Sequence, residues 1–126
     1  MKEINTPGAP AAIGPYSQAI ASHGFVFCSG QIGLDPKSGA LVSGGIEAET
    51  RRVLENLRSV LAEADLHFGD IVKTTIFLVD LADFDIVNRI YGEHLSQPYP
   101  ARSTVQAAAL PRKARVEIEA IAMKRD

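Results

Sequence analysis

The sequence has few of the residues that build cross-links and metal sites. Cys28 is its only cysteine among 126 residues, which excludes an intrachain disulfide and a multi-cysteine metal site and fits a reducing compartment. The three histidines, His23, His67 and His94, lack the spacing of a metal triad. At this length a chain buries roughly two thirds of its unfolded surface, so we expect a core that needs neither disulfides nor a structural metal.

Long apolar runs and an excess of positive charge are also missing. No run approaches the roughly 18 apolar residues that span a membrane, and the first five residues lack the apolar segment of a secretion signal. The formal net charge is −2, with both signs interspersed, whereas nucleic-acid binding usually shows itself as a basic stripe. We therefore expect a cytoplasmic protein that binds neither a membrane nor nucleic acid.

The composition is that of a folded globular chain. Hydrophobic residues make up 46% of it and charged residues 22%, which is far from the composition of disordered proteins. No internal repeat, linker or low-complexity segment divides the sequence. We expect a single domain over residues 1–126.

Periodicity predicts two helices among about six strands. One helix is expected from residue 46 to about 64, and a second, capped by Asp80 or Asp83, runs to about His94. Strands are expected at residues 16–21, 25–32 and 71–79, which are rich in apolar and β-branched residues. Two helices can cover only one face of such a sheet, and apolar residues on the strands indicate that a partner subunit covers the other: Phe25, Phe27, Phe77 and Val79.

The last quarter of the chain contains the candidate chemistry. Residues 100–107 and 115–122 alternate polar and apolar side chains, and the short Leu-Pro-Arg-Lys connection favours pairing of the two strands as a hairpin. In that hairpin the two polar sides coincide and form a pocket floor. The side chains on that floor are Arg102, Thr104, Gln106, Arg115, Glu117 and Glu119.

Two interpretations of the carboxylates remain open from spacing alone. Glu117 and Glu119 could perform acid and base chemistry, or they could simply pair with neighbouring arginines. The Arg102 guanidinium can hold a carboxylate through two parallel hydrogen bonds. Cys28 is expected to be a buried small residue, and Ser29 is not in a G-x-S-x-G nucleophile turn. The residues by themselves therefore predict a small-anion pocket and nothing finer.

Several motifs, in order along the whole chain, closely resemble the RidA (YjgF) family of reactive-intermediate imine deaminases. They are Gly14-Pro15-Tyr16-Ser17-Gln18-Ala19, residues 29–39 beginning Ser29-Gly30-Gln31-Ile32-Gly33, Gly69-Asp70-Ile71-Val72-Lys73-Thr74-Thr75, Pro100-Ala101-Arg102-Ser103 and Val116-Glu117-Ile118-Glu119-Ala120. Any one of them would be a weak signal, and their shared order makes the resemblance specific.

The resemblance implies an α+β fold, with a mixed six-stranded sheet and two helices packed on one face. This chorismate-mutase-like domain would assemble as a homotrimer with pockets between subunits. It also implies hydrolysis of small 2-imino acids and their enamine tautomers, such as 2-aminoacrylate and 2-iminopropanoate, to 2-oxo acids and ammonia. No metal or organic cofactor is expected for this reaction.

Carried over to this sequence, the resemblance makes Arg102 the group that holds the substrate carboxylate and Glu117 the group that positions or activates water. Tyr16, Ser29 and Asn88 would line the pocket, with the Gly30 backbone near the ligand. Thr104 would also contact the substrate, although many members have cysteine there. The alternative is a regulatory trimer that binds small carboxylates without turnover. A ribonuclease role, attached to some relatives, is disfavoured by the acidic balance.

Overall fold

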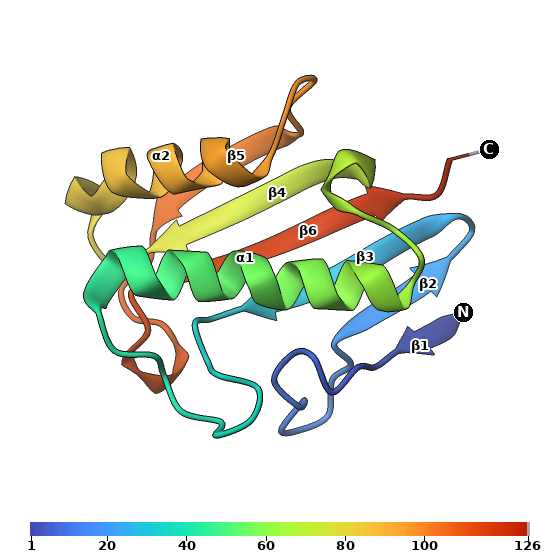
Figure 1. Cartoon of the computed structure of the whole chain (residues 1–126), viewed down its shortest axis with the longest axis horizontal. Helices are drawn as coiled ribbons and strands as arrows, with labels where there is room; N and C mark the ends of the chain where they lie inside the picture. The colour runs from blue at the N-terminus through green and yellow to red at the C-terminus, as the bar shows by residue number, and fades with distance from the viewer. Residues whose placement is uncertain (126) are drawn as a thin grey trace.

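A six-stranded sheet with two helices on one face forms the framework of the described chain (Figure 1). The structure is a computed structural model and describes residues 1–125. The helices are α1 (Gly45–Glu63) and α2 (Phe84–His94). The strands are β1 (Lys2–Ile4), β2 (Ala19–Ser22), β3 (Phe25–Gln31), β4 (Ile71–Leu78), β5 (Ala101–Gln106) and β6 (Val116–Met123). The expected α+β architecture is confirmed.

The strand order is β1-β2-β3-β6-β4-β5, and only the β4–β5 pair is parallel. The parallel pair requires a crossover, and α2 supplies it between β4 and β5. Both helices begin and end within one residue of their expected positions, if Asp83 is taken as the residue before α2. The other candidate cap, Asp80, caps a separate 3₁₀ turn, Leu81–Asp83, ahead of α2. None of the helices in residues 1–125 combines the length and apolarity needed to cross a membrane.

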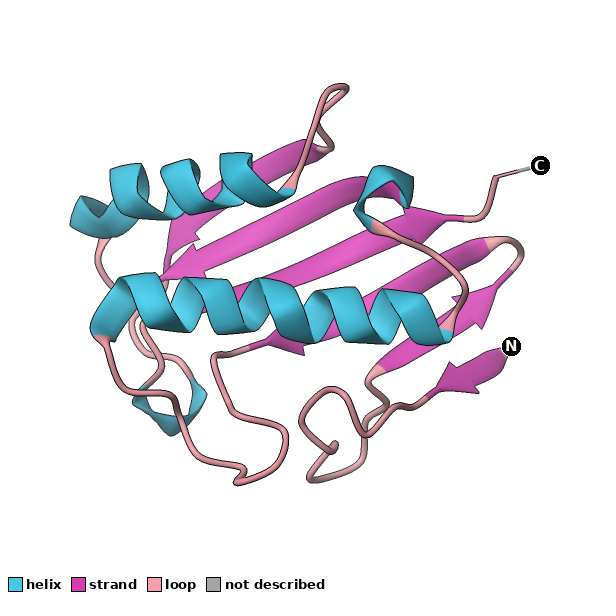
Figure 2. Ribbon diagram, viewed as in Figure 1, coloured by secondary structure: helices cyan, strands magenta, loops and turns pink. Residues whose placement is uncertain are grey.

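The predicted hairpin of residues 100–107 with 115–122 is wrong. β4 lies between β5 and β6 and pairs with both of them (Figure 2). The connection at residues 107–115 bonds to the end of β4 on both sides, through Ala107 N to Leu78 O at 2.8 Å and Val79 N to Arg115 O at 3.2 Å. The alternating pattern of each strand is real, but it does not encode which strand is the partner.

A second expectation fails with the hairpin, because the polar sides of β5 and β6 do not coincide. Arg102 pairs in register with Thr74, whose side chain is buried beneath the helices. Glu117 pairs with Phe77, on the opposite face of the same sheet. Arg102 and Thr104 therefore belong to the helix-covered face, and Glu117 and Glu119 belong to the open face.

The open face is strongly apolar around its polar centre. Figure 1 shows both helices on the same side of the sheet, which leaves the other side uncovered in a single chain. Three large side chains on that face are between 43% and 47% exposed: Phe27, Val105 and Met123. An apolar face of this kind is typical of an interface. The expectation of an uncovered second face is confirmed, whereas its partner remains a prediction.

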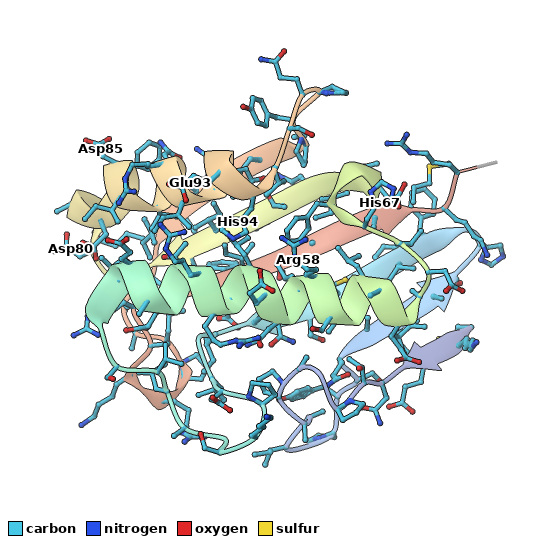
Figure 3. The ribbon with its side chains drawn as sticks, in the orientation of Figure 1. Arg58, His67, Asp80, Asp85, Glu93 and His94 are labelled. Carbon is cyan, nitrogen blue, oxygen red and sulfur yellow. The ribbon has the colours of Figure 1, made fainter. Side chains whose placement is uncertain are left out.

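The two helices are joined on their outer side by exposed charges. Arg51 on α1 pairs with Glu93 on α2 at 2.9 Å, and Arg89 on α2 pairs with Glu47 on α1 at 3.6 Å. Figure 3 labels Glu93 on the part of α2 that faces α1, whereas Asp85 lies on its outer side. Exposed pairs of this kind contribute about 0–1 kcal/mol each. The charged outer face of α1 is thus explained by solvation and helix pairing.

Candidate functional site

Arg102 lies against two aromatic rings and has no carboxylate partner among residues 1–125. Its guanidinium carbon lies 5.1 Å from the centroid of the Tyr91 ring and 5.6 Å from that of Phe84, both on α2. All the ion pairs that arginines form in residues 1–125 involve arginines other than Arg102. Ring contacts stabilise the cation without consuming its N–H groups. The arrangement leaves the guanidinium available for an external anion.

A hollow of about 340 Å³ opens beside this guanidinium, and we call it the arginine hollow. Its lining residues are Asn88, Tyr91, Gly92, Tyr99, Pro100 and Arg102. Thr104 is two residues further along β5 on the same face, and its buried hydroxyl oxygen is the one such side-chain atom in residues 1–125 without a hydrogen-bond partner. An unpaired buried hydroxyl costs free energy. Asn88 lies beside Arg102 in this hollow, as expected. Thr104 is close to Arg102 in the sequence but does not line the hollow.

Glu117 lies on the open face, half-buried, directly over Gly30. A Cβ built on Gly30 would be 2.8 Å from Glu117 Cδ, so any larger residue at this position would displace the Glu117 side chain. Burial raises the pKa of the Glu117 carboxyl, and the nearby Glu119 carboxylate raises it further. A carboxyl with a raised pKa is a stronger base when ionised, which suits it to accept a proton from water.

A second hollow, of about 510 Å³, surrounds Glu117, and we call it the glutamate hollow. It brings together four of the predicted site residues: Tyr16, Ser29, Gly30 and Glu117. The Ser29 hydroxyl donates to Ser17 O at 2.6 Å, which fixes the direction of its oxygen. The remaining wall is mainly apolar and comes from the N-terminal loop, the end of β3 with the loop after it, and the 3₁₀ turn before β6: Pro10, Ala11, Ala12, Ile13, Gln18, Gln31, Ile32, Leu34, Pro111 and Arg112.

Gln18 holds the proline-rich wall of the glutamate hollow in place. This side chain is 3% exposed and accepts from Thr6 N at 2.7 Å. Its amide nitrogen donates to Thr6 O at 3.1 Å and to Pro10 O at 2.9 Å. The proline-containing segment has no strand partner of its own, and the Gln18 amide takes that role. The position of the wall therefore depends on one buried side chain.

Glu49 of α1 fixes the start of the strand that bears Glu117. Its side chain is fully buried and accepts from Arg115 N at 2.8 Å and from Arg115 Nη1 at 2.6 Å. Removing the Arg115 side chain, which is itself half exposed, would leave the buried Glu49 charge uncompensated. Arg115 therefore pairs with α1 rather than with the carboxylates of β6, and Glu117 and Glu119 form no ion pair within residues 1–125.

One chain thus carries two hollows on opposite faces of its sheet, which are candidate half-sites. The arginine hollow contains Arg102 and Asn88, and the glutamate hollow contains Tyr16, Ser29, Gly30 and Glu117. The sequence did not reveal that Tyr91 and Phe84 contact Arg102, because their helical spacing indicates only a core face. It also gave no role to Gln18. Among residues 1–125 no three histidine, cysteine or acidic side chains gather as a metal site would require.

Comparison with known proteins gives close matches over the full chain. Residues 6–124 match the family model described as endoribonuclease L-PSP. A mouse protein named 2-iminobutanoate/2-iminopropanoate deaminase is 51% identical over 123 residues, which cover 98% of this chain and 91% of that protein. The crystal structure of RidA from the Antarctic bacterium Psychrobacter sp. PAMC 21119 has a TM-score of 0.95 at 42% identity, with 98% and 99% of the two chains covered. E. coli TdcF, solved with bound serine, has a TM-score of 0.92 at 42% identity, with 99% and 100% covered.

Proposed function

The chain belongs to the endoribonuclease L-PSP family, which includes the RidA proteins, and on that premise we propose that it is an imine deaminase. It hydrolyses reactive 2-imino acids and their enamine tautomers to 2-oxo acids and ammonia. Relatives at about 50% identity over nearly the whole chain bear the names of such deaminases. We also propose that it acts in the cytoplasm without a cofactor.

The observation that carries this proposal is the guanidinium of Arg102 against two rings, with no ion pair to a carboxylate among residues 1–125. A 2-imino acid presents a carboxylate next to the C=N bond, so the group that binds the carboxylate also places the reacting carbon. TdcF binds serine, which has the same α-carboxylate. Two parallel hydrogen bonds from Arg102 would fix that carboxylate in one orientation.

Water is the second reactant, and Glu117 is the group we assign to it. The ionised carboxyl accepts a proton from water as the oxygen forms a bond to the imine carbon. The same carboxyl then returns that proton to the imine nitrogen, which completes a carbinolamine. It next takes the proton of the new hydroxyl group and passes it to the amino nitrogen, so that the C–N bond breaks, the carbonyl forms and ammonia leaves. An imine carbon is already electrophilic, so orientation and proton transfer supply most of what the reaction needs.

The two half-sites can form one site only between two copies of the chain. Because Arg102 and Glu117 lie on opposite faces of their sheet, we propose that Arg102 of one copy meets Glu117 of the next. Repeated around a threefold axis, this heterologous contact closes into a trimer with three equivalent sites. It also covers the apolar open face, where Phe27, Val105 and Met123 are exposed in the single chain.

Hydrolysis of imines generated in solution tests the proposed activity. We expect the protein, at substoichiometric amounts, to accelerate ammonia release when an amino-acid oxidase converts alanine or 2-aminobutanoate to its imine. Semicarbazide, which traps imines, should form less adduct in the presence of the protein. Heat-denatured protein is the control. If none of a panel of parent amino acids gave an accelerated reaction, the proposed function would be wrong.

A further inference from the structure

We propose that Tyr91 is a positioning residue that holds the Arg102 guanidinium in the orientation that binds a carboxylate. This inference rests on the proposed function, because it concerns the carboxylate-binding half of the same site. Tyr91 is on α2 and 4% exposed, and its ring centroid is 5.1 Å from the Arg102 guanidinium carbon. Nothing in the sequence pattern separates it from the other core residues of this helix.

The ring of Tyr91 is itself fixed by the strand next to Arg102. Its hydroxyl lies 2.8 Å from Thr74 Oγ1, and both residues are buried. Thr74 is the residue of β4 that pairs in register with Arg102 of β5. Strand, helix and neighbouring strand therefore form a closed arrangement in which Thr74 orients Tyr91 and Tyr91 orients Arg102.

The positive charge of Arg102 also acts on the Tyr91 hydroxyl, because the two side chains are close together. Burial raises the pKa of Tyr91, while the Thr74 hydrogen bond and the Arg102 charge oppose that rise. A flexible arginine loses side-chain entropy on binding a ligand, and a guanidinium already held against a ring loses less. The contribution of Tyr91 should therefore appear in the affinity for a carboxylate.

Binding of 2-oxobutanoate, measured by titration calorimetry on the assembled protein, tests the inference. Tyr91→Leu removes the ring, and we expect a dissociation constant about tenfold higher than for the unchanged protein. Tyr91→Phe keeps the ring, so its dissociation constant should stay within about threefold although the Thr74 hydroxyl loses its partner. If Tyr91→Leu does not fold, Phe84→Leu provides the test instead. It removes the second, half-buried ring and should weaken binding several-fold.

A double-mutant cycle separates positioning from simple loss of stability. In an Arg102→Ala background, Tyr91→Leu should have no further effect on binding, although it should still lower the melting temperature. Val87→Ala shortens a buried side chain of the same helix and leaves a cavity in the core. It should lower the melting temperature without changing the affinity for 2-oxobutanoate. Unchanged binding by folded Tyr91→Leu, equal weakening in the Arg102→Ala background, or equal weakening by Val87→Ala would each overturn the inference.

The same data distinguish failure of this inference from failure of the proposed function. Imine hydrolysis by the unchanged protein together with unaltered binding by Tyr91→Leu would refute only the role of Tyr91. Tyr91-dependent binding without hydrolysis of any imine would refute only the deaminase activity. If the unchanged protein did not bind 2-oxobutanoate, the role of Arg102 as a carboxylate receptor would be wrong, and the role of Tyr91 with it.

Discussion

Arg102→Ala is expected to lower kcat/KM for imine hydrolysis by at least about 100-fold. Each charge-assisted hydrogen bond to the substrate carboxylate contributes about 1.5–3 kcal/mol, and about 1.4 kcal/mol corresponds to a factor of ten in rate. Losing two such bonds removes about 3–6 kcal/mol. Arg102→Lys keeps the charge but not the planar pair of donors, so it should restore less than about a tenth of the activity. Steady-state kinetics with imine generated in situ measure both variants.

Arg89→Ala is the matched control for that experiment. Arg89 is an arginine of α2 itself, the helix that contacts Arg102, but it is exposed and pairs with Glu47 and Glu93 on the outer surface. Its loss should cost no more than about 1 kcal/mol of stability and leave kcat/KM within about twofold. Near-native kcat/KM in a correctly folded Arg102→Lys protein would show that a point charge suffices, and the assignment of a two-bond carboxylate contact would fail.

Glu117→Gln is expected to reduce kcat by about 10²–10⁴-fold, which is the usual contribution of a positioned acid–base group. The amide has almost the same shape, so the fold and the affinity for 2-oxobutanoate should change little. In the unchanged protein, kcat/KM should fall as the pH is lowered through the pKa of Glu117, because the base must be ionised. Since that pKa is raised, the fall should begin above the ordinary glutamate value of about 4.3.

Glu119→Gln is the matched control, and we expect it to shift the pH profile rather than to lower kcat. Glu119 lies two residues further along β6 on the same face, and its charge raises the pKa of Glu117. Removing that charge should lower the Glu117 pKa and move the acidic limb of the pH profile to lower pH, with most of kcat retained. If Glu117→Gln kept near-native kcat and Glu119→Gln lost it, the water-activating role would belong to Glu119.

The helices were predictable from sequence because their evidence is local. Val53, Leu57, Val60 and Leu61 recur at the helical period, and all four are at most 1% exposed. Strand β1 escaped prediction, since Lys2–Ile4 is too short for an alternating pattern to be recognised. The same period-two pattern that correctly located β5 and β6 could not reveal that β4 separates them.

The candidate residues could be chosen from the sequence, but their geometry could not. The motifs pointed to Arg102 and Glu117, and each proves to line a hollow. Their placement on opposite faces depends on the register of three strands, which no single segment encodes. The contact of Tyr91 with Arg102 depends on how α2 packs over β4 and β5, and the Gln18 hydrogen bonds depend on the path of the N-terminal loop.

The central claim is that Arg102 and Glu117 act together from different copies of the chain. Arg102→Ala and Glu117→Gln proteins, each nearly inactive alone, can be unfolded together in equal amounts and refolded, with mass tags to verify mixed trimers. Random assembly gives about a quarter of the sites both native side chains, so we predict recovery of up to about a quarter of native activity. Mixed trimers without recovered activity would contradict the account, because they would show that the two side chains do not meet between copies.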